Sequence, residues 1–167
     1  MPLAPGLRKL TLTSHVVASV GWFGAVGTFL ALAVVGLTSA DDGLARAVHV
    51  AMEPATWWVI VPLSLASPVT GLVQALGTTW GLFRHYWVIA KLVLTVPATV
   101  VLLVHARPIG HLAEIASGPS PLGPDLDGVR VQLLVDAGAA LLVLLAATAL
   151  STYKPRGLTR RGRRVAR

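Results

Sequence analysis

The sequence predicts an all-α integral membrane protein, a four-helix bundle whose N- and C-termini are both cytoplasmic. The chain has 167 residues, of which 54% are hydrophobic and only 13% are charged, whereas an average soluble chain has about 25% charged residues. At about 20 residues per span, this length accommodates four or five crossings with short loops. The composition excludes an intrinsically disordered chain and a soluble nucleic-acid-binding domain. The absence of cysteine excludes a disulfide-stapled secreted module.

Four apolar stretches have the length of a spanning helix. They cover about residues 10–37, 46–76, 86–106 and 129–153. The first is too long for the apolar core of a signal peptide, which has roughly 7 to 15 residues, so we interpret it as a retained helix. The second contains Pro54, Pro62 and Pro68. We therefore expect an amphipathic entry over 45–53 and a kinked span after it.

The connections between the spans differ in length and composition. We expect two short connections, at 38–43 and 77–85, and one long loop at 107–128. The Gly, Pro, Ser and Asp content of the long loop argues against regular structure there. Residues 1–153 therefore form the transmembrane domain, and residues 154–167 form a basic tail.

Basic residues are concentrated on one side of the predicted membrane. Ten of the 14 lie in the N-terminal segment, the 77–85 connection and the tail, without any acidic residue: Arg8, Lys9, Arg84, Lys154, Arg156, Arg160, Arg161, Arg163, Arg164 and Arg167. The positive-inside rule places this side in the cytoplasm. We expect a multi-pass protein of the cell membrane, of the prokaryotic inner or plasma membrane type. We expect the tail to contact anionic lipid head groups, at ~1 kcal/mol per base. It lacks the interleaved aromatic residues of a nucleic-acid-binding segment.

Polar residues inside the predicted spans are the candidates for function. An ionisable group in hydrocarbon costs at least ~2.5 kcal/mol on insertion scales, so it usually faces a partner or a cavity. By depth, these residues sort into two layers. The inner, cytoplasmic layer contains His15 and Lys91, with His85 at its mouth; the outer layer contains His49, Glu53, His105, Gln132 and Asp136.

Two kinds of site fit these residues. Histidines near both surfaces of a four-helix bundle suit haem, because imidazole supplies an axial nitrogen. His15, His85 and His105 are the candidate haem ligands, and Lys91 is a cation for an acidic group on the ligand. Alternatively, the outer residues His49, Glu53, His105 and Asp136 bind Zn, Fe or Cu. Plain structural roles also remain open, with the histidines bonded to carbonyls or water, Lys91 extended to the interface, and the carboxylates paired with nearby bases.

Three motifs occur in the order found in one membrane-protein family. They are His15-Val16-Val17 followed by Trp22-Phe23-Gly24-Ala25, then Pro62 with Ser67 and Gly71, then Trp87-x-x-x-Lys91-Leu92. In this set the chain resembles the HemJ-type protoporphyrinogen oxidases, in the broad sense that includes CopD-like proteins. The resemblance covers roughly residues 13–104. It departs from the family before the second helix, where a basic cluster is reduced to Arg46, and at the spacing of His105.

The resemblance implies a protein that binds b-type haem or a porphyrin. In that family, the residues matching His15 and Lys91 serve cofactor binding and activity, so Lys91 is the candidate catalytic residue. The implied chemistry is oxidation of protoporphyrinogen IX, with electrons passing to a respiratory-chain partner. Three functions therefore stand at this point: a haem-dependent membrane oxidoreductase, a metal- or proton-handling protein, and a non-catalytic accessory subunit. A homo-oligomer is compatible with each of them.

Overall fold

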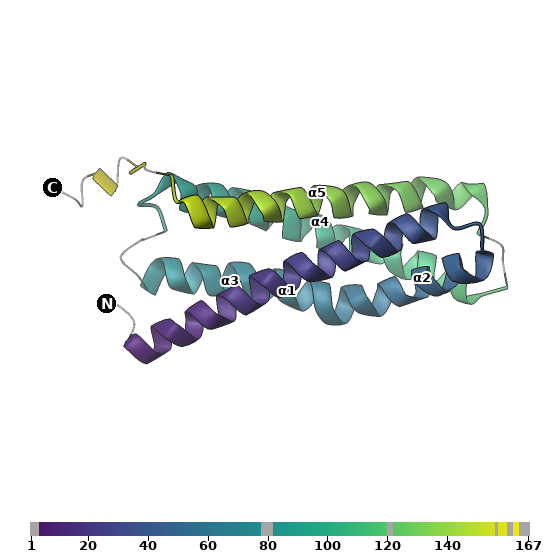
Figure 1. The fold of residues 1–167 in the computed structure, drawn as a ribbon, viewed down its shortest axis with the longest axis horizontal. Coiled ribbons are helices and arrows are strands. Elements are labelled where there is room, and N and C mark those ends of the chain that lie inside the picture. The colour runs from purple at the N-terminus through teal and green to yellow at the C-terminus, as the bar shows by residue number, and fades with distance from the viewer. Residues whose placement is uncertain (1–3, 78–81, 120–121, 156, 160–161, 164–167) are drawn as a thin grey trace.

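The computed structural model describes residues 4–77, 82–119, 122–155, 157–159 and 162–163. Its elements are α1 (Pro5–Thr38), α2 (Asp42–Ala55), the π-helical turn η1 (Thr56–Ile60), α3 (Val61–Gly77), α4 (Tyr86–Ser117), the 3-10 turn η2 (Pro124–Leu126) and α5 (Asp127–Tyr153). The helices run along one axis, and the start of α1 and the end of α5 lie at the same end of the molecule (Figure 1). We call this the inner end, and the opposite end, where α1 meets α2, the outer end.

Four helical segments are long and apolar enough to cross a membrane. They are Pro5–Thr38, Asp42–Gly77, Tyr86–Ser117 and Pro124–Tyr153. In the described residues, the remaining regular pairing is one isolated antiparallel bridge between His85 and Leu158. The predicted fold class, an all-α bundle of four membrane-spanning helices, is confirmed. Trp80 and the tail residues Arg156, Arg160, Arg161, Arg164 and Arg167 lie outside the described residues.

The second span is irregular where its prolines predict a kink. Asp41 begins α2 by accepting hydrogen bonds from the backbone N–H groups of Gly43 and Leu44, at 2.8 and 3.3 Å. The helix then widens into η1, and the N–H of Val61 bonds to the carbonyl of Thr56, five residues back. Pro62 follows directly. A proline has no N–H and its ring clashes with the carbonyl four residues back, so a wider turn before it removes that conflict.

The third long helix extends further than the sequence predicts. The expected irregular loop at 107–128 is wrong in its first half, because α4 continues through Pro108 to Ser117. The extension buries a helical stripe, Ile109, Leu112, Ala113 and Ala116, and α4 packs against α2. Packing of this stripe stabilises the helix by more than its proline and glycine content disfavours it.

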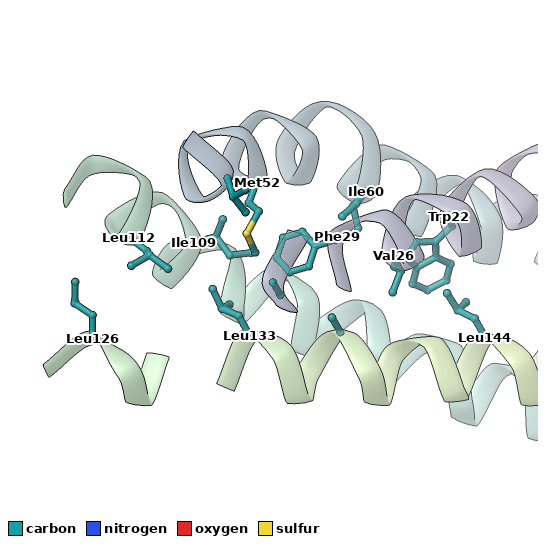
Figure 2. Close-up of a cluster of buried hydrophobic side chains, with 13 residues drawn as sticks. Trp22, Val26, Phe29, Met52, Ile60, Ile109, Leu112, Leu126, Leu133 and Leu144 are labelled. Atoms are coloured by element: carbon teal, nitrogen blue, oxygen red, sulfur yellow. The ribbon is translucent and has the colours of Figure 1, made fainter. Parts of the chain in front are cut away.

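The main hydrophobic cluster lies toward the outer end. Figure 2 shows Trp22, Val26 and Phe29 of α1 facing Leu133 and Leu144 of α5, with Met52, Ile109 and Leu112 beyond them. Of the described residues, the cluster includes none from α3, none of α1 before Trp22 and none of α5 after Leu144. Toward the inner end the buried apolar side chains are mostly small, among them Ala18, Ala75 and Ala147.

Candidate functional site

His15 of α1 is held by the backbone of α3. Its Nδ1 lies 3.0 Å from the carbonyl oxygen of Ser67 and 3.2 Å from the hydroxyl of Thr70. A carbonyl only accepts hydrogen bonds, so Nδ1 must carry the proton, and the lone pair of the neutral ring lies on Nε2. This is the tautomer in which Nε2 can bind a metal.

A glycine makes room for this ring. A Cβ atom added to Gly71 would lie 2.9 Å from Cε1 of His15, which is closer than real Cβ contacts allow. Ser19 and Ser67 add a hydroxyl–hydroxyl hydrogen bond of 2.8 Å across the same two helices. The motif residues His15, Ser67 and Gly71 therefore meet at one seam between α1 and α3.

Lys91 of α4 joins the same inner region. Its Nζ donates to the hydroxyl of Ser151 in α5 at 2.5 Å, and that hydroxyl donates to the carbonyl of Ala147 at 2.9 Å. The Lys91 side chain is half-buried rather than extended into solvent. The inner layer thus combines an oriented imidazole and an ammonium group from opposite sides of the bundle.

His85 has a different environment from these two residues. It is the residue before α4, its backbone pairs with Leu158, and its ring centre lies 6.2 Å from that of Trp87. Neighbouring backbone groups hold the start of the tail, because Thr159 bonds to the carbonyls of Phe83 and Arg84. The surroundings of His85 are those of a chain-pairing segment at the inner end.

Two helices meet at His105 in the outer layer. Its Nδ1 bonds to the carbonyl of Val101 in its own helix at 2.9 Å, and its Nε2 lies 2.8 Å from the amide nitrogen of Gln132 in α5. A carboxylate oxygen of Asp136 is 3.6 Å from the same Nε2. Three of the predicted outer polar residues therefore form one cluster between α4 and α5.

The other two outer residues face elsewhere. His49 is buried, bonds through Nδ1 to the carbonyl of Ala45 at 2.6 Å, and packs its ring against Gly36. Glu53 faces Gly110, whose added Cβ would lie 3.3 Å from its carboxylate. In the described part of the chain, no three His, Asp or Glu residues are arranged to hold a metal ion. The four residues predicted as metal ligands thus do not converge, although His105 and Asp136 do.

Sequence reasoning missed a cleft at the outer end, between α2 with η1 and α4. Its volume is about 550 Å³. The lining residues are Glu53, Trp57, Ala106, Arg107, Gly110, His111, Glu114 and Ser117. Those after Ala106 repeat at three- and four-residue intervals, which is the signal of a helix face. This helix face was not predicted, because residues 107–128 were expected to form an irregular loop.

Comparison of this chain with protein-family models, with curated proteins and with solved structures finds no match.

Proposed function

We propose that this chain is a membrane redox protein that binds b-type haem or a porphyrin in the inner half of the bundle. The observation that supports this most directly is the hydrogen bond from Nδ1 of His15 to the carbonyl of Ser67. A histidine that ligates a metal typically donates its second ring N–H to such an acceptor, which fixes its tautomer and orientation. His15 is the ligand in this proposal.

A macrocycle with acidic side chains needs a cationic partner near its histidine ligand. Lys91 supplies an ammonium group that can pair with a propionate, and Ser151 positions it. When bound, the haem supplies one-electron chemistry. The chain's own residues hold it, orient it and neutralise its carboxylates.

The first test is an absorption spectrum of the protein purified in mild detergent, oxidised and dithionite-reduced, with haem quantified per chain. We expect a Soret band and reduced α and β bands at close to one haem per chain. His15→Ala should abolish them. Lys91→Ala should retain the spectrum and lower the affinity by about tenfold, because one charge-assisted hydrogen bond is lost.

A matched control separates a ligand from a histidine of general structural importance. His105→Ala removes a histidine that bonds to its own helix and to Gln132, so haem content should be unchanged. Full haem occupancy in both His15→Ala and Lys91→Ala would contradict the proposal. Loss of haem in His105→Ala but not in His15→Ala would move the site to the outer layer.

Turnover is a separate question from binding. We further propose, from the HemJ resemblance, that the haem-loaded protein oxidises protoporphyrinogen IX in membranes, with the electrons passing to a respiratory-chain partner, and that Lys91→Ala lowers the rate. Equal rates for haem-loaded wild type and Lys91→Ala would restrict the role of Lys91 to binding.

The outer cluster supports a second candidate function, proton handling. One carboxylate oxygen of Asp136, Oδ2, is buried and has no hydrogen-bond partner among the described residues, and it lies 3.6 Å from His105. Ionisable pairs inside spans often relay protons. Asp136→Asn should abolish proton flux into proteoliposomes that carry a pH-sensitive dye, while Asp125→Asn in the outer turn leaves it intact. Equal flux in Asp136→Asn and wild type rejects this function.

A further inference from the structure

We propose that the outer cleft binds a zwitterionic aminophospholipid, with its ammonium and phosphate groups held between α2 and α4. This inference is independent of haem. It follows from the depth of the cleft, the charges that line it, a second hollow beside it and one glycine in its wall.

The cleft lies where lipid head groups are found. At ~1.5 Å per residue, the 32 residues of α4 span about 48 Å, whereas a bilayer's hydrocarbon core is about 30 Å thick. A helix that enters the core near Tyr86 leaves it after about 20 residues, close to Ala106. The cleft begins at Ala106 and extends to Ser117. It therefore occupies the polar layer of the outer leaflet.

The charged side chains that line the cleft have both signs. Glu53 lines it from α2, and Arg107, His111 and Glu114 line it from α4; within the described ranges none of these four side chains forms a hydrogen bond or an ion pair. The two carboxylates and the guanidinium together carry a net charge of −1. A ligand that carries both an ammonium and a phosphate matches this set, because carboxylates attract the first and a guanidinium binds the second in bidentate fashion.

An aromatic side chain strengthens the preference for an ammonium. Trp57 lines the cleft one helical turn after Glu53, and an indole face attracts a cation. The Glu53 carboxylate and the indole therefore lie on the α2 and η1 side of the cleft. The Arg107 guanidinium comes from α4, as does the second carboxylate, that of Glu114.

A second hollow gives the site an apolar neighbour. It has a volume of about 500 Å³ and is lined by Glu53, Pro54, Trp57 and Trp58. It shares Glu53 and Trp57 with the cleft, so the two are adjacent. Trp58 is 82% exposed, as expected of a tryptophan that faces lipid at an interface. An amphiphile can place its head group in the cleft and its apolar part in the indole-lined hollow, whereas a soluble zwitterion would occupy the cleft alone.

Gly110 keeps the wall of the cleft open. A Cβ added there would lie 3.3 Å from the Glu53 carboxylate, so a larger side chain displaces Glu53 and fills the space. Gly24 offers a matched control, because it is exposed on α1 and an added Cβ meets nothing within 4 Å.

The test is native mass spectrometry of the full-length protein in detergent, titrated with dihexanoyl phosphatidylethanolamine or dihexanoyl phosphatidylglycerol. We expect one saturable adduct with the ethanolamine lipid, at least about tenfold tighter than with the glycerol lipid, since only the former has the ammonium. Gly110→Leu, Glu53→Gln and Arg107→Gln should each weaken it by about tenfold. Gly24→Leu and Asp125→Asn should bind as wild type does.

Three outcomes overturn the proposal. Equal affinity for the two lipids shows that the ammonium is not recognised. Unchanged binding in Glu53→Gln and Arg107→Gln places the lipid elsewhere, and these two polar substitutions decide the matter if Gly110→Leu does not fold. Displacement of the lipid by an equal concentration of soluble phosphoethanolamine assigns the cleft to a free zwitterion instead of a membrane lipid.

Discussion

Three histidines, His15, His49 and His105, form hydrogen bonds through the same ring nitrogen but to different partners. His49 and His105 bond through Nδ1 to carbonyls four residues back in their own helices. His15 bonds instead to Ser67 in another helix. A bond within one helix forms wherever that helix forms, so it says little about function. A bond between helices places the ring at a defined position in the bundle.

Substitution of Gly71 tests whether the position of the His15 ring affects stability and haem binding. Gly71→Ala puts a Cβ 2.9 Å from Cε1 of His15, and we expect overpacking to lower the free energy of unfolding by about 1–3 kcal/mol. Haem occupancy should fall with it. The measurements are unfolding in mixed detergent micelles and the Soret absorbance of the purified variant.

The control for this substitution is Gly24→Ala. An added Cβ at Gly24 meets nothing within 4 Å, and alanine is a better helix former than glycine by roughly 0.5–1 kcal/mol. We expect unchanged or slightly raised stability. If Gly71→Ala and Gly24→Ala have the same free energy of unfolding and the same haem occupancy, the position of the His15 ring does not affect either property.

The ends of helices are tied together by side chains from other elements. The last four carbonyls of a helix have no partner within it. Gly36 lies in the last turn of α1, and its carbonyl accepts from the guanidinium of Arg130 in α5, which also bonds to Asp127 at 3.0 Å. A positive charge near a helix C-terminus is favourable. One residue of α5 thus serves as a cap for α1.

Replacing Arg130 should separate these two helices at the outer end. We expect Arg130→Met to lower the free energy of unfolding by about 1.5–3 kcal/mol, the contribution of a hydrogen bond to a charged group. Arg8→Met removes an exposed arginine at the other end and should have little effect. Equal unfolding midpoints for the two variants would mean that the Gly36 carbonyl is satisfied in another way.

The start of the tail is held by the connection before α4. The hydroxyl of Thr159 donates to the carbonyl of Phe83 at 2.5 Å, and the N–H of Thr159 donates to the carbonyl of Arg84 at 3.1 Å. The N–H of Tyr86 donates to the carbonyl of Gly157 at 3.3 Å. Thr159 is buried. These bonds hold the inner ends of α4 and α5 together.

Thr159→Val should loosen this attachment while keeping the side-chain shape. Loss of one hydrogen bond of about 1 kcal/mol raises the open population roughly fivefold, so limited trypsin should cleave the tail about fivefold faster. Thr152→Val removes a hydroxyl bonded within α5 and serves as the control. The same cleavage rate in both variants would show that the tail opens independently of Thr159.

The whole molecule is packed unevenly along its axis. The hydrophobic cluster, which includes Phe29, Met52 and Leu133, lies toward the outer end, while the inner half has hydroxyl, imidazole and ammonium contacts between helices. Lipid tails are as apolar as a protein core, so helices in membranes associate through close packing and polar bonds. The large buried side chains therefore lie mainly in the outer half, and the inner half offers polar groups that a ligand can engage.

Removing a large side chain from the outer core should be costly. Phe29 is 6% exposed, and Phe29→Ala should destabilise the bundle by about 3 kcal/mol, the low end of the range for soluble proteins, because the cavity remains but the transfer from water does not apply. Leu142 is 68% exposed on α5, so Leu142→Ala should be nearly neutral. Unfolding midpoints in detergent compare the two, and similar midpoints would contradict a core at this end.

Most of the fold could be predicted from local sequence, and the main exception results from packing between helices. The kink of the second span follows from Pro54 and Pro62. The extension of α4 past Pro108 did not follow, because composition there indicates a loop and only the buried stripe beginning at Ile109 reveals the helix. The candidate site, too, could be predicted only in part from the sequence. The sequence placed His15 and Lys91 in one layer as a prediction, whereas it gave no indication of their partners Ser67 and Ser151.

The sequence by itself determined that this chain is an all-helical membrane protein with four spans and two depths of polar residues. These properties depend on hydropathy averaged over about 20 residues and on a rise of ~1.5 Å per residue, which are local quantities. Only the tertiary structure decided which polar residues meet: His105 with Asp136, His15 with α3, and Glu53 with the cleft beside Gly110. The reason is that the rotation of each helix about its own axis is set by packing against its neighbours.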